Sequence, residues 1–173
     1  MRRSVANNLN DISKDHTDLI AELAVDWLKD APTERRRLVE HAGRSLVKAG
    51  HRRALEALGY GPPDMTVEAF RVLTPIVRLG GKLEFELTLA STASEPQGLI
   101  VDYVVHHPKA NGTTSPKVFK WKKLTLATGD AHGAVRKHAI RPISTRRYYR
   151  GRHRVEVVAN GSTLAGGDFE LEM

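Results

Sequence analysis

The sequence predicts an α+β chain in two domains, a helical domain followed by an antiparallel β-sandwich. Two observations support this division. Apolar residues recur every three or four positions over the first 60 residues and every second position from residue 66 onward. A segment with two glycines and two prolines, GYGPPD, lies between the two patterns. We therefore expect helical repeats at 1–59, a linker at 60–65 and a sandwich at 66–173.

The first domain reads as four short helices, each with one apolar face. They are expected at about residues 5–12, 19–28, 33–49 and 52–58. Asp15 or Thr17 can cap the second helix, and Gly50 follows the third. Short helices of this kind cannot bury their apolar faces alone, so the pattern is typical of the last repeats of a longer helical stack.

The second domain reads as seven or eight short strands. Leu83 to Leu89 alternate with polar residues, and similar alternation follows at residues 99–105, 155–157 and 169–171. Turn signals separate the runs at roughly 10–15 residue spacing, which indicates an immunoglobulin-like sandwich. The parity of apolar residues switches at Lys122-Lys123, which predicts a β-bulge there.

The composition excludes several classes of protein. The chain has no cysteine, so disulfide scaffolds, thiolate zinc sites and cysteine nucleophiles are ruled out. No apolar run reaches the roughly 18–20 residues needed to span a bilayer, and the polar N-terminus does not resemble a signal peptide. The eight histidines show no chelating spacing. We expect a cytoplasmic protein with no metal, no cofactor and no membrane contact.

Positive charge is concentrated in the β domain. The net charge is +7, yet residues 117–154 hold 12 basic residues and a single acid. Such a cluster is typical of a surface that binds a polyanion, although a basic surface kept for solubility is the alternative. The candidate phosphate contacts are Lys117, Lys120, Lys122, Lys123, Arg146, Arg147, Arg150, Arg152 and Arg154. Of the adjacent Tyr148 and Tyr149, one is expected to stack on bases and the other to lie in the core.

The opening helix carries a polar face. Arg3, Asn7, Asn10, Asp11 and Lys14 fall at spacings of three and four and therefore line one side, with Asn8 beside them. Asparagine and aspartate are poor helix formers, so their concentration needs a compensating interaction. That interaction is either a ligand or a hydrogen bond to a neighbouring helix.

The segment Arg3–Asp15, RSVANNLNDISKD, resembles a signature of bacterial DNA alkylation-repair glycosylases of the AlkC/AlkD-like, HEAT-like repeat family. Residues 27–30, 37–48 and 57–63 are similar to the C-terminal repeats of that family, and residues 102–149 resemble the immunoglobulin-like domain that some members carry. The N-terminal bulk of the family's repeat domain has no match in this chain. The resemblance implies a C-terminal part that binds double-stranded DNA and is inactive alone.

The reaction that the resemblance implies is excision of cationic alkylated purines such as 3-methyladenine. Its transition state carries positive charge on the sugar, which a carboxylate stabilises. Asp11 is the catalytic candidate; Asn7, Asn8 and Asn10 would contact sugar or phosphate or hold Asp11 in place, and Arg3 and Lys14 would bind phosphates. Two other functions remain open at this point: a non-enzymatic DNA-binding module, and a module whose basic strands bind an acidic protein.

Overall fold

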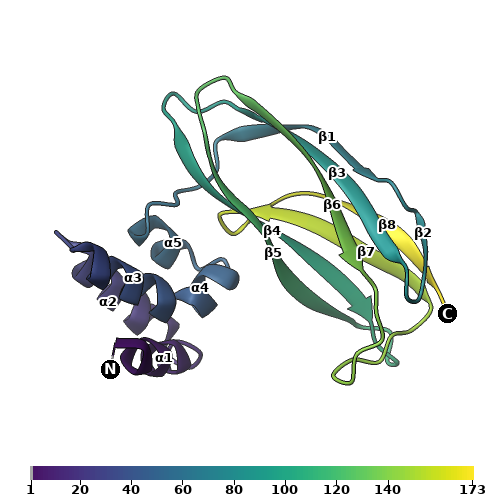
Figure 1. Ribbon diagram of the computed structural model, residues 1–173, viewed down its shortest axis with the longest axis horizontal. Coiled ribbons are helices and arrows are strands. Elements are labelled where there is room, and N and C mark those ends of the chain that lie inside the picture. The colour runs from purple at the N-terminus through teal and green to yellow at the C-terminus, as the bar shows by residue number, and fades with distance from the viewer. Residues whose placement is uncertain (1) are drawn as a thin grey trace. The chain divides into compact units, whose positions relative to one another are not determined.

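The computed structural model describes residues 2–173 (Figure 1), so the first residue of the expected domain 1–59 lies outside the described part. Helices come first and strands follow, as expected for an α+β chain. The chain forms two compact units: a helical unit up to Pro63, with which Asn160–Ser162 are grouped, and a β unit of Asp64–Ala159 and Thr163–Met173. None of the helices in residues 2–173 combines the length and the apolarity that crossing a bilayer requires.

The helical unit is built from five helices. They are α1 (Arg2–Ile12), α2 (Thr17–Leu28), α3 (Thr33–Ala42), α4 (Arg44–Lys48) and α5 (Arg52–Ala57). One group of buried apolar residues joins α2 to α4 and α5 through Ile20, Leu46 and Ala54. A second group joins α2 to α3 through Leu28 and Val39. The apolar stripes therefore face a shared interior, which is the arrangement that the 3.6-residue period predicts.

Helices α1 and α3 lie side by side and run in the same direction. The side chain of Asn7 meets His41 of α3, and one turn further along α1 Asn10 meets Ser45 of α4, the helix that follows α3. Helix α2 connects them in sequence and packs against both apolar groups. Equivalent turns of α1 and α3 thus lie next to each other, and this alignment positions the candidate site described below.

The expected third helix is in fact two helices, because it breaks at Gly43 between α3 and α4. Glycine is a poor helix former and offers no side chain to cap α4. The side-chain oxygen of Asn10 instead accepts a hydrogen bond from the backbone N–H of Ser45, in the first turn of α4, at 3.1 Å. Asn10 therefore supplies, from α1, the cap that α4 lacks. The capping expected of Asp15 or Thr17 is wrong, since His16 precedes α2 and no side chain caps it.

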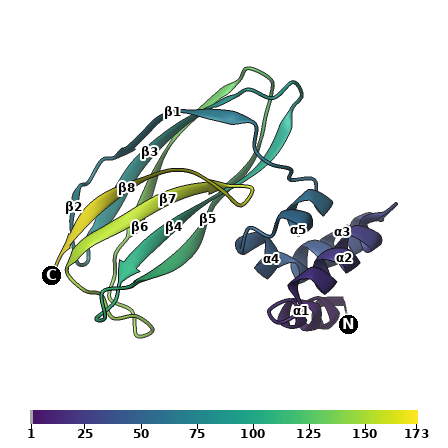
Figure 2. The same ribbon diagram turned by 180° about the vertical axis from the view of Figure 1, so that it is seen from behind.

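The β unit contains eight strands within residues 64–173. They are β1 (Met65–Val72), β2 (Ile76–Arg78), β3 (Lys82–Ser91), β4 (Gln97–Pro108), β5 (Thr114–Leu126), β6 (Ala131–Ala139), β7 (Gly151–Ala159) and β8 (Ser162–Glu172). They form a three-stranded sheet in the order β1-β3-β6 and a five-stranded sheet in the order β2-β8-β7-β4-β5. Figures 1 and 2 show the two sheets facing each other as a sandwich. One pairing departs from the expected antiparallel pattern, because β2 runs parallel to β8.

Alternating residues of both sheets form the sandwich core. Leu83 and Phe85 of β3, Tyr103 of β4 and Val155 of β7 are almost completely buried. Aromatic rings occupy its centre: Tyr103 stacks on Phe119 with the ring centroids 5.2 Å apart. Phe85 meets the edge of Trp121 at 5.4 Å. The period-two alternation therefore predicts the inward-facing residues correctly.

The β-bulge lies one residue before its expected position. Lys120 pairs with Asp102, and Lys122 pairs with Val101, so Trp121 is the extra residue of β5. Val101 is a core residue, and its partner Lys122 therefore lies on the inner side of the sheet. Lys122, one of the candidate phosphate contacts, therefore does not lie on the outer side of the sheet.

Candidate nucleic-acid interface

The structure separates the polar residues of α1 into buried and exposed groups. Asn10 is only 3% exposed and caps α4, so its amide is not accessible to a phosphate. Asn7 is half-buried, and its side-chain oxygen lies 2.9 Å from Nε2 of His41. Asn8 and Arg3 are exposed. For Asn7 and Asn10 the compensating interaction is thus a hydrogen bond to a neighbouring helix.

Asp11 is an exposed, ionised carboxylate. It accepts a hydrogen bond from Nζ of Lys14 at 2.7 Å, and both side chains are more than half exposed. The hydrogen bond and the positive charge of Lys14, together with the charge of Arg44, hold the pKa of Asp11 below its ordinary value. A carboxylate in this state can stabilise a positive charge but has no proton to donate near neutral pH.

Helix α3 and the start of α4 contribute residues that the sequence reasoning missed. Arg37, His41 and Arg44 follow one another at i, i+4 and i+7, the spacing that places residues on one side of a helix. His41 contacts Asn7, and the charge of Arg44 acts on Asp11, so this side of α3 and α4 adjoins the polar side of α1. The spacing of Arg37, His41 and Arg44 is the feature of the sequence from which this second polar side could have been predicted.

An open groove of about 510 Å³ lies between the first turns of α1 and α3. Its polar lining consists of Arg2, Arg3, Glu34, Arg37 and His41. Within residues 2–173 the three arginines make no hydrogen bond or ion pair, whereas Arg52 and Arg53 of α5 bind carboxylates. Unpaired guanidinium groups around a groove form a favourable site for an anion.

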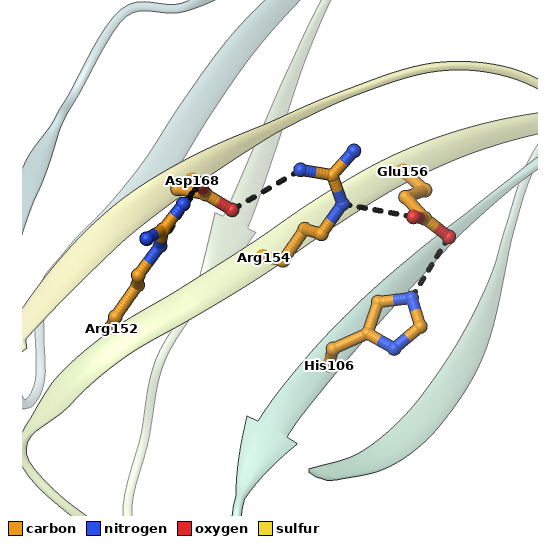
Figure 3. Close-up of polar contacts among 5 residues, drawn as sticks. All are labelled: His106, Arg152, Arg154, Glu156 and Asp168. Carbon is orange, nitrogen blue, oxygen red and sulfur yellow. Dashed lines mark hydrogen bonds and ion pairs between the residues drawn. The ribbon is translucent and has the colours of Figure 1, made fainter.

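On the β unit, two of the expected phosphate contacts are already paired with acids. Figure 3 shows the chain of contacts, which runs across β7, β8 and β4. Nε of Arg152 donates to Asp168 at 3.0 Å, while Arg154 donates to Asp168 at 3.3 Å and to Glu156 at 2.9 Å. Glu156 also lies 2.9 Å from Nε2 of His106. Arg152 and Arg154 are therefore neutralised, contrary to the expectation that they are free cations.

The ionisation of these acids is favoured by their partners. The pKa of Asp168 is lowered chiefly by the hydrogen bond from Arg152. Burial raises the pKa of Glu156, but hydrogen bonds from Arg154 and His106 outweigh burial and the net shift is downward. The hydrogen bond to Glu156 raises the pKa of Arg154. All four charges of the network thus persist over the neutral range, and they cancel.

The lysines of β5 differ in their exposure. Lys117, Lys120 and Lys123 are exposed. Lys122 is partly buried and donates a hydrogen bond to Nε2 of His132 at 2.8 Å. Burial and the charge of Lys122 both lower the pKa of His132. Lys122 therefore links β5 to β6 through a hydrogen bond and is not an exposed cation.

The connection between β6 and β7 carries the remaining candidates. Arg146 turns inward, with Nη1 2.6 Å from Nε2 of His107 and its guanidinium over the ring of Tyr148. Arg147 and Arg150 are exposed. Tyr148 is buried and belongs to the core, so the prediction that one of the two tyrosines is a core residue is confirmed.

No group of three or more His, Asp or Glu side chains in residues 2–173 has the geometry of a metal site. The buried histidines of the β unit are disfavoured as cations. Burial lowers the pKa of His107 to about 3 and that of His138 to about 4, with nearby arginine charges adding to both shifts.

Three comparisons place the chain among known proteins. A family model for the C-terminal Ig-like domain of the uncharacterised protein YhaZ matches residues 66–173. The uncharacterized protein YhaZ of Bacillus subtilis (strain 168) is 31% identical over 177 residues, which cover 99% of this chain and 47% of that protein. The helical unit therefore lies within the region of similarity.

A solved structure of the Pseudomonas fluorescens alkylpurine DNA glycosylase AlkC, bound to DNA containing an abasic site analog, matches with a TM-score of 0.93 and 38% identity. The match covers 99% of this chain and 48% of AlkC. The chain thus spans about half the length of both relatives. A β-glucosidase from Listeria innocua, at 15% identity and a TM-score of 0.54 over 66% of this chain and 17% of its own, shares only the fold.

Proposed function

The chain belongs to the family of the YhaZ C-terminal Ig-like domain, and from this premise we propose that it is part of a DNA glycosylase that excises alkylated purines. The observation that carries the proposal is the match to AlkC, with a TM-score of 0.93 over 99% of the chain. A likeness of that extent includes the helical unit as well as the sandwich. The substrates we propose are cationic alkylated purines such as 3-methyladenine in double-stranded DNA.

The helical unit, which we propose to be a HEAT-like repeat remnant, would contribute chemistry and phosphate contacts. Breaking the bond between a cationic base and its sugar leaves positive charge on the sugar, and water then adds at the same carbon. Asp11, exposed and ionised, is suited to stabilise that charge. The proposed contacts to sugar or phosphate on this unit are Arg3, Asn7, Asn8, Lys14, Arg37, His41 and Arg44.

The β unit would extend the contact with DNA through phosphates. Lys117, Lys120, Arg147 and Arg150 are exposed and, within residues 2–173, form no ion pair of the kind that holds Arg152 and Arg154. The proposed contacts on this unit are Lys117, Lys120, Lys123, Arg147 and Arg150. Such contacts are independent of base sequence and weaken with salt.

The chain covers about half of each relative, so we further propose that it binds DNA by itself but needs additional residues for excision. Two measurements test the function. The first is the affinity for a DNA duplex as a function of salt concentration. A steep negative dependence of log K on log salt supports phosphate binding, and a slope near zero favours the alternative of an interface for an acidic protein.

The second measurement tests Asp11 without requiring turnover. A duplex containing a positively charged abasic-site analogue imitates the charge on the sugar, and a neutral analogue provides the reference. We expect the chain to prefer the cationic duplex and Asp11→Asn to lose that preference. Asp15→Asn, an exposed acid just beyond α1, is the matched control and should retain it. Equal preference in the parent and Asp11→Asn chains would exclude Asp11 as the catalytic carboxylate.

A further inference from the structure

Two buried histidines lie beneath the connection between β6 and β7. His107, near the end of β4, is 3% exposed, and His153, near the start of β7, is 2% exposed. Their ring centroids are 5.4 Å apart, with the rings almost perpendicular. Tyr148 packs against His107, and Phe169 packs against His153. Histidine is seldom buried this completely, so the pair calls for an explanation.

The hydrogen bonds fix the protonation of both rings. A guanidinium group has only donors, so Nη1 of Arg146, 2.6 Å from Nε2 of His107, requires a lone pair on that nitrogen. His107 is therefore neutral and carries its proton on Nδ1. Nδ1 of His153 lies 3.0 Å from the carbonyl oxygen of Gly151, so it donates and leaves a lone pair on Nε2. The remaining ring nitrogens, the donor Nδ1 of His107 and the acceptor Nε2 of His153, are buried and have no hydrogen-bond partner among residues 2–173.

The Arg146 side chain is the main polar anchor of its connection. Between residues 141 and 150, one backbone hydrogen bond is present in this part of the structure, from the Arg146 N–H to the Ile143 carbonyl at 3.3 Å. A segment with so few backbone bonds is held by its side chains. Arg146 and Tyr148 point inward, while Arg147 lies over the ring of Tyr149 and remains exposed. Anchoring Arg146 therefore determines how Arg147 and Arg150 are presented.

The choice of a neutral acceptor has an electrostatic consequence. Arg152 and Arg154 are held by carboxylates, which cancel their charge. Arg146 is held by an imidazole and a tyrosine ring, neither of which carries a negative charge. The side chain is fixed in place, and the positive charge of the connection is retained.

We propose that His107 is a positioning residue that preserves charge: it orders the 141–150 connection through Arg146 and leaves the positive charge of Arg146 uncancelled, so that the connection, with its exposed Arg147 and Arg150, attracts a DNA phosphate. His153 supports it by packing against its ring. That the ligand is a DNA phosphate rests on the proposed function. The anchoring of Arg146 by His107 rests on geometry alone.

A matched pair of variants tests the charge. His107→Gln supplies a neutral oxygen acceptor, and His107→Glu supplies an acceptor that cancels the charge of Arg146. We expect His107→Gln to bind a DNA duplex within about twofold of the parent chain. We expect His107→Glu to lose about one phosphate contact, which lowers the slope of log K against log salt by about 0.9 and the affinity at 0.1 M salt by about eightfold. Equal binding by the two variants overturns the role of charge preservation.

Nitrogen-15 NMR of the parent chain tests the anchor independently of DNA. We expect His107 to show the Nδ1–H tautomer and no titration near neutral pH, and we expect sharp, protected signals for the Arg146 guanidinium. An Nε2–H tautomer or a charged ring at pH 7 overturns the anchor. If the parent chain fails to bind any duplex, the proposed function and the phosphate part of this proposal both fall, and the NMR result still decides whether His107 orders the connection.

Discussion

Asn10 offers the sharpest test of how the polar face of α1 is used. Its side chain is 3% exposed and accepts the Ser45 N–H at 3.1 Å in the first turn of α4. Replacing it by alanine removes the cap and leaves the partly buried Ser45 N–H without an acceptor. Loss of a capping hydrogen bond costs about 1–2 kcal/mol of stability, and the better helix propensity of alanine recovers only a fraction of that.

The expected consequence is local as well as global. A cost of about 1–2 kcal/mol corresponds to roughly a 5- to 30-fold change in an opening equilibrium, so exchange of the Ser45 amide should accelerate by that factor in Asn10→Ala. Urea unfolding of the helical unit, followed by circular dichroism, should show the matching loss of stability. Hydrogen-exchange NMR measures the first quantity directly.

Asn8→Ala is the matched control, because Asn8 is exposed on the same helix. We expect it to leave the Ser45 amide unchanged and to lower the affinity for duplex DNA. Asn10→Ala should keep its affinity at a temperature where both variants are folded. If Asn10→Ala instead weakens DNA binding without changing Ser45 exchange or stability, Asn10 is a ligand residue and the capping argument is wrong.

Three further predictions concern the β unit. Asp168→Asn should free Arg152, while Arg154 stays paired with Glu156, and should steepen the salt dependence of duplex binding by about one phosphate contact; an unchanged slope in a salt titration would contradict this. The pKa values of Asp168 and Glu156 are lowered in the folded chain, so the stability they contribute is complete above their unfolded pKa values and is lost as pH falls through the folded ones. Urea unfolding should therefore lose more stability between about pH 5 and about pH 3 in the parent chain than in a variant with Asn and Gln at these two positions. Phe85→Ala removes a fully buried ring and should cost about 3–5 kcal/mol in the urea unfolding of the β unit; a loss below about 1 kcal/mol would show that the aromatic cluster contributes little.

The spacing of apolar residues predicted the helices, the strands and their inward faces, because buried positions recur every 3.6 residues in a helix and every second residue in a strand. It did not predict the break at Gly43 or the role of Asn10, since both depend on a hydrogen bond between α1 and α4. The bulge was misplaced by one residue because its position is set by pairing with β4, which the sequence of β5 alone does not contain.

The charge of the β unit was overestimated for a similar reason. Residues 117–154 were counted as a block, but Asp168 reaches Arg152 and Arg154 from the neighbouring strand β8. One signal was available in the sequence: Glu156 lies two positions after Arg154 and therefore shares its side of the strand. The inward turn of Arg146 had no such signal, because its partner His107 lies 39 positions away.

The three-residue strand β2 bears on how the protein behaves at high concentration. By pairing with β8 through Ile76 to Arg78, it occupies part of the hydrogen-bonding border that β8 would otherwise offer to another molecule. The border that β2 itself presents is only three residues long, and its charged Arg78 disfavours pairing with a further strand. We therefore expect this end of the sandwich to resist the strand-by-strand recruitment from which amyloid-like fibres grow.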